Sequence, residues 1–162
     1  MAAAPADVAA LTERLGRAPQ ADFEVVVRDA AGSPVVVRNE PFTRDGRPMP
    51  TRYWLVDPEL TLRISRVEAA GGVRSAQAEV SAEAVRATHD AYAAERDAAV
   101  PAGHVGPRPS GGVGGTRVGV KCLHAHYANL LAGADDPVGR WTAEQIEAAE
   151  QIEAAEQIEA QA

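Results

Sequence analysis

Two valine-rich segments lie close together in the first quarter of the chain, and they constrain its fold more than any other feature. They read FEVVVRD (23–29) and PVVVRNE (34–40), and the four residues AAGS between them include a glycine. Two β-branched runs joined by a short link of this kind predict a β-hairpin. Because the valines are nearly continuous and do not alternate with polar residues, we expect both faces of these strands to be partly covered.

A third strand is predicted at TRYWLV (51–56), after a proline-rich loop whose Asp45-Gly46 pair indicates a turn. Apolar periodicity and capping signals then predict four helices, at about 6–15, 57–70 and 81–100 and within 118–133. The second of these helices begins with Asp57-Pro58, a capping residue followed by a helix-starting proline.

The predicted elements fit a single α+β domain. We expect a small antiparallel sheet of about three strands packed against four helices, over residues 6–140, after a flexible N-terminus at residues 1–5. Residues 141–162 are predicted to form an extra, acidic C-terminal helix, with Thr142 and Gln145 as its capping box. This tail repeats the six residues EQIEAA, and that period does not produce a coiled-coil seam.

The acidity of the chain belongs to this tail. The formal net charge is −7, and six glutamates lie in the last 20 residues, so the remainder carries only −1. A nearly neutral body without a basic excess argues against nucleic-acid binding. No apolar run approaches the roughly 20 residues needed to cross a bilayer, so membrane insertion is not expected. The single cysteine permits no intrachain disulfide, which fits a cytoplasmic protein.

The segment VGVKCLHAHYANLLAG (118–133) holds the only cysteine and two of the four histidines. On a helix, Leu123 and other apolar residues would face inward, Cys122 would share one flank with His126, and His124 would lie on the other side. Were the start extended, Cys122, His124 and His126 would share one side instead. Cys122 and His126 are spaced as two metal ligands could be, but two ligands do not make a site. We therefore expect no metal and no cofactor.

The same residues leave an alternative open. A thiol in the first turn of a helix, beside Lys121, is a candidate nucleophile, and Cys122 with His124 or His126 has the composition of a cysteine hydrolase or transferase site. Such an enzyme would act on an anionic substrate. Neither an oxyanion hole nor a substrate groove is visible in the sequence, so the alternative ranks second.

A non-catalytic binding function is the preferred interpretation. Arginines surround the turn before Tyr53 and Trp54, and arginine beside aromatic rings recognises anions and partner surfaces. A glycine-rich loop leads into the predicted fourth helix, where basic side chains could bind an anion. The expected contact residues are Arg47, Arg52, Tyr53, Trp54, Arg117 and Lys121, and the partner would be a protein or a small anionic ligand.

Several segments together resemble a known family: GSPVVV, DGRPMPTRYWLVDPEL, SRVEAAGG and VKCLHA. This order is similar to that of an uncharacterised actinobacterial family, domain of unknown function 501. Genes of that family often neighbour a septum-formation-initiator-like protein and an exopolyphosphatase-like enzyme. The resemblance therefore implies an accessory role linked to cell division or polyphosphate metabolism.

The resemblance also implies a departure in this chain. Family members carry cysteines where this sequence has Asp29, Ala31 and Asp57, and those thiols with His124 or His126 would bind zinc. Aspartate and alanine are poor replacements for thiolate ligands. A degenerate structural zinc domain is thus a further alternative, with Asp57 acting as a helix cap.

Overall fold

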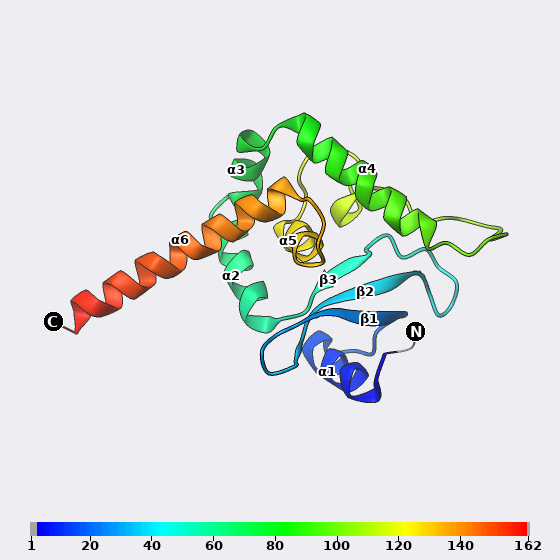
Figure 1. The fold of residues 1–162 in the computed structure, drawn as a ribbon, viewed down its shortest axis with the longest axis horizontal. Coiled ribbons are helices and arrows are strands. Elements are labelled where there is room, and N and C mark those ends of the chain that lie inside the picture. Colours follow the sequence, from blue (N-terminus) through cyan, green and yellow to red (C-terminus); the bar gives the residue numbers. More distant parts are fainter. Residues whose placement is uncertain (1–2, 162) are drawn as a thin grey trace.

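The hairpin predicted from the valine runs forms and lies between α1 and the remaining helices (Figure 1). The computed structural model describes residues 3–161, and its three strands form one antiparallel sheet in the order β1-β2-β3. They span Ala21–Arg28 (β1), Pro34–Thr43 (β2) and Tyr53–Leu55 (β3). The turn between β1 and β2 is held by Asp29, whose carboxylate accepts hydrogen bonds from the backbone N–H groups of Ala31 and Ser33.

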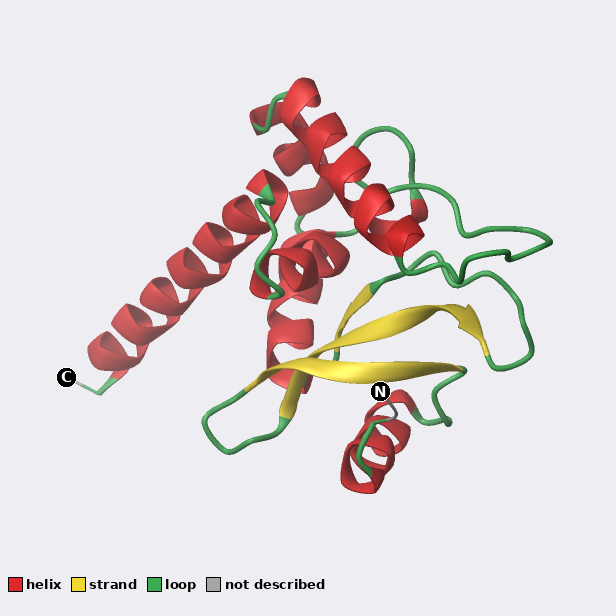
Figure 2. Ribbon diagram, turned by 45° about the vertical axis from the view of Figure 1, so that its right-hand side comes forward, coloured by secondary structure: helices red, strands yellow, loops and turns green. Residues whose placement is uncertain are grey.

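Helices cover both faces of this sheet, as Figures 1 and 2 show. Helix α1 lies on one side, and most of the other helices lie on the other. Their bounds are Pro5–Leu15 (α1), Pro58–Ala69 (α2), Gly72–Glu79 (α3), Ala82–Ala98 (α4), Leu123–Leu131 (α5) and Pro137–Ala160 (α6), with a short 3₁₀ turn at Val113–Gly115. The α+β prediction is confirmed.

Two apolar clusters explain why the valines are continuous. On one face Val37 packs in a cluster with Leu11 of α1, and on the other face Val36 packs in a cluster with Tyr92 of α4. Both valines are completely buried. Since successive side chains of a strand point to opposite faces, a strand covered on both sides needs apolar residues at consecutive positions.

Helix α3 is not predicted by the sequence pattern, in which Gly71-Gly72 marks the end of α2 and the next helix starts at Ser81. In the structure α2 does end there, but Gly71 adopts φ +94° and leads directly into α3. This short helix presents Val73 and Ala76 to the core. Alanine gives a weak apolar signal because it buries little surface, so the periodicity of α3 is hard to recognise.

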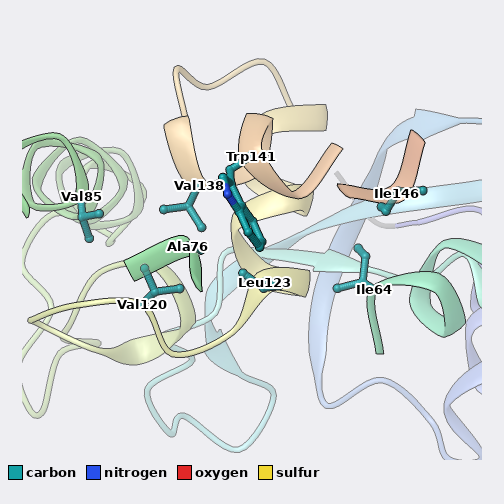
Figure 3. Packing of buried hydrophobic residues seen from close by; sticks show 8 residues of the cluster. All are labelled: Ile64, Ala76, Val85, Val120, Leu123, Val138, Trp141 and Ile146. Atoms are coloured by element: carbon teal, nitrogen blue, oxygen red, sulfur yellow. The ribbon is translucent and has the colours of Figure 1, made fainter. Parts of the chain in front are cut away.

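The capping box predicted at Thr142 is wrong, because the N-cap of α6 lies six residues earlier. Asp136 caps it by accepting a hydrogen bond from the backbone N–H of Gly139. Thr142 is fully buried inside the helix, and its hydroxyl donates to the Val138 carbonyl. The first turns of α6 belong to the largest apolar cluster, which Figure 3 shows with Ile64, Ala76, Val85, Val120, Leu123, Val138, Trp141 and Ile146.

Beyond Ile146, α6 runs away from the body of the protein towards the C-terminal end (Figure 1). Ile152 and Ile158 are 60% and 71% exposed, and ion pairs join Glu150 to Arg63 and Glu153 to Arg66. The predicted boundary between the α+β domain and the C-terminal tail at residue 141 stays a prediction, although α6 is continuous across it. Of the expected flexible residues 1–5, the first two lie outside the described part, and α1 begins at Pro5.

The exposed end of α6 leads to a prediction about stability. Removing residues 154–162 is expected to change the free energy of unfolding by less than about 1 kcal/mol, because residues 154–161 are all exposed and bury little apolar surface. Urea denaturation of the full and shortened chains would measure it. A loss above about 2 kcal/mol would show that this segment packs against something in solution.

Within residues 3–161, no helix combines the length and the apolar character needed to span a bilayer.

Candidate functional site

Three side chains with metal-binding or nucleophilic atoms converge where α2 meets α5, and we call them the thiol cluster. Glu68 comes from the last turn of α2, Cys122 directly precedes α5, and His124 lies in the first turn of α5. One ligand atom from each lies within 4.8 Å of the others. The side chains of Glu68 and His124 are 27% and 22% exposed, so the cluster is reachable from solvent.

The end of the preceding loop determines how Cys122 is presented. Cys122 is the N-cap residue of α5 and has extended backbone angles (φ −151°, ψ 118°). Its side chain does not cap the helix; instead the Glu68 carboxylate accepts a hydrogen bond of 2.7 Å from the backbone N–H of Leu123. Leu123 is completely buried and fixes this end of α5 against the core. The thiol is therefore free to face His124.

His124 is held through both ring nitrogens. Its Nε2 lies 3.0 Å from the Thr61 carbonyl oxygen and 3.3 Å from the Ser65 hydroxyl. A carbonyl only accepts, so Nε2 carries a hydrogen. The other nitrogen, Nδ1, lies 3.3 Å from the Glu68 carboxylate and 3.9 Å from the Cys122 sulfur. Thr61 thus orients the imidazole so that Nδ1 points to the thiol and the carboxylate.

The surroundings of His124 favour its protonated form. They raise the pKa of His124 from 6.5 to about 9. The hydrogen bond with the Cys122 side chain is the largest cause, and the Thr61 carbonyl and the negative charge of Glu68 add to it, while burial acts in the opposite direction. In the metal-free chain, Nδ1 of His124 therefore holds a proton at neutral pH.

The predicted placement of the cysteine and histidines is wrong in two respects. Cys122 does not lie within the helix, so it shares no flank with His126, and it meets His124, which was placed on the opposite side. His126 is completely buried and far from an exposed flank. Glu68 was missed, because its contact with a residue 54 positions further along depends on helix packing that no local pattern encodes.

His126 belongs to a separate group of side chains, the buried polar network of His126, Asn129 and Asp136. Nδ1 of His126 lies 2.9 Å from an Asp136 carboxylate oxygen, and the Asn129 amide donates to the same carboxylate at 2.9 Å. Each of these three residues is at most 2% exposed. The network joins α5 to the start of α6, so we assign it to stability.

His89 is also part of the core, and it holds the glycine-rich loop. Its Nδ1 accepts a hydrogen bond from the backbone N–H of Val113, and Nε2 bonds to the Gly119 carbonyl. His104, in the exposed part of that loop, stacks on Phe42 with ring centroids 4.3 Å apart. Neither histidine contributes to the thiol cluster.

The six residues predicted to bind a partner lie in different environments. Arg52 and Tyr53 are only 8% and 6% exposed. The Arg52 guanidinium donates to the Asn39 carbonyl, the Tyr53 hydroxyl donates to Glu95, and burial raises the pKa of Tyr53 to about 12.

Three of the remaining predicted residues are exposed and one is half-buried. Trp54 is the half-buried one, and it packs beside Val37 and Val56. Arg47 is exposed and paired with Asp45 at 2.8 Å. Arg117 and Lys121 are exposed on the segment that leads to Cys122, and Arg117 lines a hollow that does not include Arg47 or Arg52.

The two aspartates that the family resemblance pairs with cysteines serve the backbone. Asp29 holds the hairpin turn, and Asp57 caps α2 by accepting a hydrogen bond of 2.8 Å from the Leu60 N–H. The predicted capping role of Asp57 is confirmed. Neither aspartate belongs to the thiol cluster.

Comparison with known proteins places all three residues of the thiol cluster inside one matched region. The sequence model of a family described as "Protein of unknown function (DUF501)" matches residues 25–144. No curated protein and no solved structure matches the chain.

Proposed function

Because this chain belongs to the DUF501 family, whose description names no reaction or ligand, we propose its function from the thiol cluster: it is a zinc-binding protein that holds one Zn²⁺ ion through Glu68, Cys122 and His124. The observation that carries the proposal is the convergence of a carboxylate oxygen, a thiol sulfur and an imidazole nitrogen within 4.8 Å of one another. These are the three ligand types that zinc takes in proteins.

The distances within the cluster support zinc. A tetrahedral ion with bonds of about 2.0 Å to nitrogen and oxygen and about 2.3 Å to sulfur separates nitrogen from oxygen by about 3.3 Å and nitrogen from sulfur by about 3.5 Å. The separations are 3.3 Å between His124 Nδ1 and Glu68 Oε1, and 3.9 Å between that Nδ1 and the Cys122 sulfur. The third separation, between the Glu68 carboxylate and the Cys122 sulfur, is at most 4.8 Å, so metal binding would draw the thiol closer to the other two ligands.

The groups around the three ligands also support zinc. Histidine ligands in metal sites donate their second N–H to a carboxylate or a backbone carbonyl, and ligating carboxylates are themselves hydrogen-bonded. Here the Thr61 carbonyl lies 3.0 Å from Nε2 of His124, and the Leu123 N–H donates to Glu68. Three protein ligands leave one coordination position for water or an exogenous anion, which fits a binding protein for a small anionic ligand.

A second candidate is a cysteine-dependent hydrolase or transferase. It is favoured by Nδ1 of His124, which faces the Cys122 sulfur while Thr61 orients the opposite side of the ring. However, Glu68 faces the same nitrogen as the thiol and would compete with it for the proton. The three hollows described within residues 3–161 are lined by other residues, so none of them offers this candidate a substrate groove.

Zinc titration of the metal-free chain tests the proposal. We expect one zinc ion per chain, and an affinity at least about tenfold weaker in each of Cys122→Ser, His124→Gln and Glu68→Gln. In Glu68→Gln the amide oxygen can still accept a hydrogen bond from the Leu123 N–H, so the start of α5 is preserved. A competing chromophoric chelator gives the affinities, and cobalt substitution reports a sulfur ligand through thiolate-to-metal charge transfer.

Two matched variants control for non-specific binding. Glu59→Gln changes an exposed glutamate on the same helix, and His104→Gln changes a histidine outside the cluster; both should bind zinc as the unmodified chain does. Equal zinc affinity in Cys122→Ser and the unmodified chain would refute the site. Absence of zinc binding, together with alkylation of Cys122 much faster than that of a free thiol, would favour the enzyme candidate.

The broader expectations stay predictions. An accessory role linked to cell division or polyphosphate metabolism, a protein partner and a cytoplasmic location follow from the resemblance and the composition. Zinc binding is compatible with each of them.

A further inference from the structure

Arg117, which the thiol cluster does not use, lines a hollow on another part of the surface. We call it the cationic hollow; it lies between the end of α3, the start of α4 and the loop before Cys122, and has a volume of about 200 Å³. Its walls include Val80, Ala82, Val85, Arg86, Arg117 and Val118. Two arginines and several apolar side chains therefore surround one small space.

The charge of the cationic hollow is unusual for this chain. Its lining includes no aspartate or glutamate, although the chain as a whole carries −7. Most other arginines are paired: nine of them form ion pairs with carboxylates. Arg86 and Arg117 form neither an ion pair nor a side-chain hydrogen bond with any residue in 3–161. The two guanidinium groups are available to a ligand.

The loop that carries Arg117 is fixed on its inner side. The Val120 N–H donates to the Gln77 side chain at 3.0 Å, and the Gly119 carbonyl bonds to the buried ring of His89 at 2.9 Å. Gly119 has φ +68°, and a Cβ there would lie 2.6 Å from Gln77. One wall of the hollow is thus held in place before any ligand arrives, which lowers the entropic cost of binding.

We propose that the cationic hollow binds a small organic anion, with the anionic group between Arg86 and Arg117 and a short apolar body against Val80, Val85 and Val118. Guanidinium groups pair with carboxylate and phosphate through two parallel hydrogen bonds. At about 30 Å³ for each water-sized group, the hollow holds roughly six or seven heavy atoms. This size fits a four-carbon carboxylate.

Three four-carbon probes test the charge requirement: butanoate, the isosteric neutral butanamide, and the cationic n-butylammonium. Two-dimensional NMR of the labelled chain at low ionic strength would follow the backbone amides of Val80, Val118 and Gly119. We expect saturable shifts with butanoate, at least about tenfold weaker binding of butanamide, and none of n-butylammonium. Methyl phosphate shows whether the anionic group can be a phosphate. Because the arginines are exposed, binding should weaken as salt is added.

Exposed variants locate the site without disturbing the fold. Arg86→Gln and Arg117→Gln are each expected to weaken butanoate binding at least about threefold, and Ala82→Leu to weaken it by filling the hollow. Arg74→Gln is the matched control, because Arg74 is an exposed arginine on α3 outside the hollow and should leave binding unchanged. Equal binding of butanoate and butanamide, no shift with any anion, or equal weakening by Arg74→Gln and Arg86→Gln would overturn the proposal.

Discussion

Replacing Asp136 with alanine is expected to destabilise the fold by about 3–5 kcal/mol, because several buried hydrogen bonds and a helix cap are lost together. The Asp136 carboxylate is completely buried and accepts hydrogen bonds from Asn129 and from the Gly139 backbone, beside Nδ1 of His126. Without it, three buried donors lose their acceptor, and α6 loses its cap. Each effect alone costs about 1 kcal/mol or more.

The neighbouring aspartate is a stringent control for this prediction. Asp135 is exposed, with a side chain that is 88% accessible and paired only with Arg140. Asp135→Ala should therefore cost no more than about 0.5 kcal/mol. Urea denaturation of both variants, compared at equal m-value, gives the difference in their free energies of unfolding. If Asp136→Ala were as stable as Asp135→Ala to within about 1 kcal/mol, the buried polar network would not hold α5 and α6 together.

Lowering the pH from 8 to 6 is expected to weaken zinc binding about a hundredfold through His124 alone. The pKa of His124 in the metal-free chain is about 9, so throughout this range Nδ1 holds a proton that zinc must displace. Affinity then falls about tenfold for each pH unit below the pKa and levels off above it. Chelator competition at several pH values measures the slope.

Lowering the pH is expected to stabilise the metal-free fold through His124, which is opposite to its effect on zinc binding. A pKa that folding raises from 6.5 to about 9 stabilises the fold fully below pH 6.5, and this contribution is lost as the pH rises through 9. NMR titration of the His124 ring in the metal-free chain measures its pKa directly. Cys122→Ala should lower that pKa, because the Cys122 side chain is its largest cause. A value near 6.5 in the unmodified chain, or zinc affinity independent of pH between 6 and 8, would contradict this account.

Much of the fold could be predicted from the sequence, because its strongest signals are local. The valine runs form β1 and β2, and the link between them is too short for anything but a hairpin. Asp57 caps α2 through a residue only three positions away. Such contacts depend on neighbouring residues and survive in any tertiary context.

The start of α6 shows where local signals compete. Both Asp136 followed by Pro137 and Thr142 followed by Gln145 are helix-start patterns. The structure uses the earlier one, because Val138 and Trp141 can then join the apolar cluster of α2 and α5. Burial of those side chains contributes more free energy than either cap, and a local pattern does not include that term.

The candidate sites were decided by tertiary structure. The sequence by itself determined a hairpin with two covered faces and the cap of α2, but it left open whether His124 lies on the same side as Cys122. It could not determine that Glu68 meets Cys122 or that Arg86 and Arg117 line one hollow, since these pairs are 54 and 31 positions apart. Only the packing of complete helices brings such residues together, because their separation in space is fixed by the core between them and not by the chain that connects them.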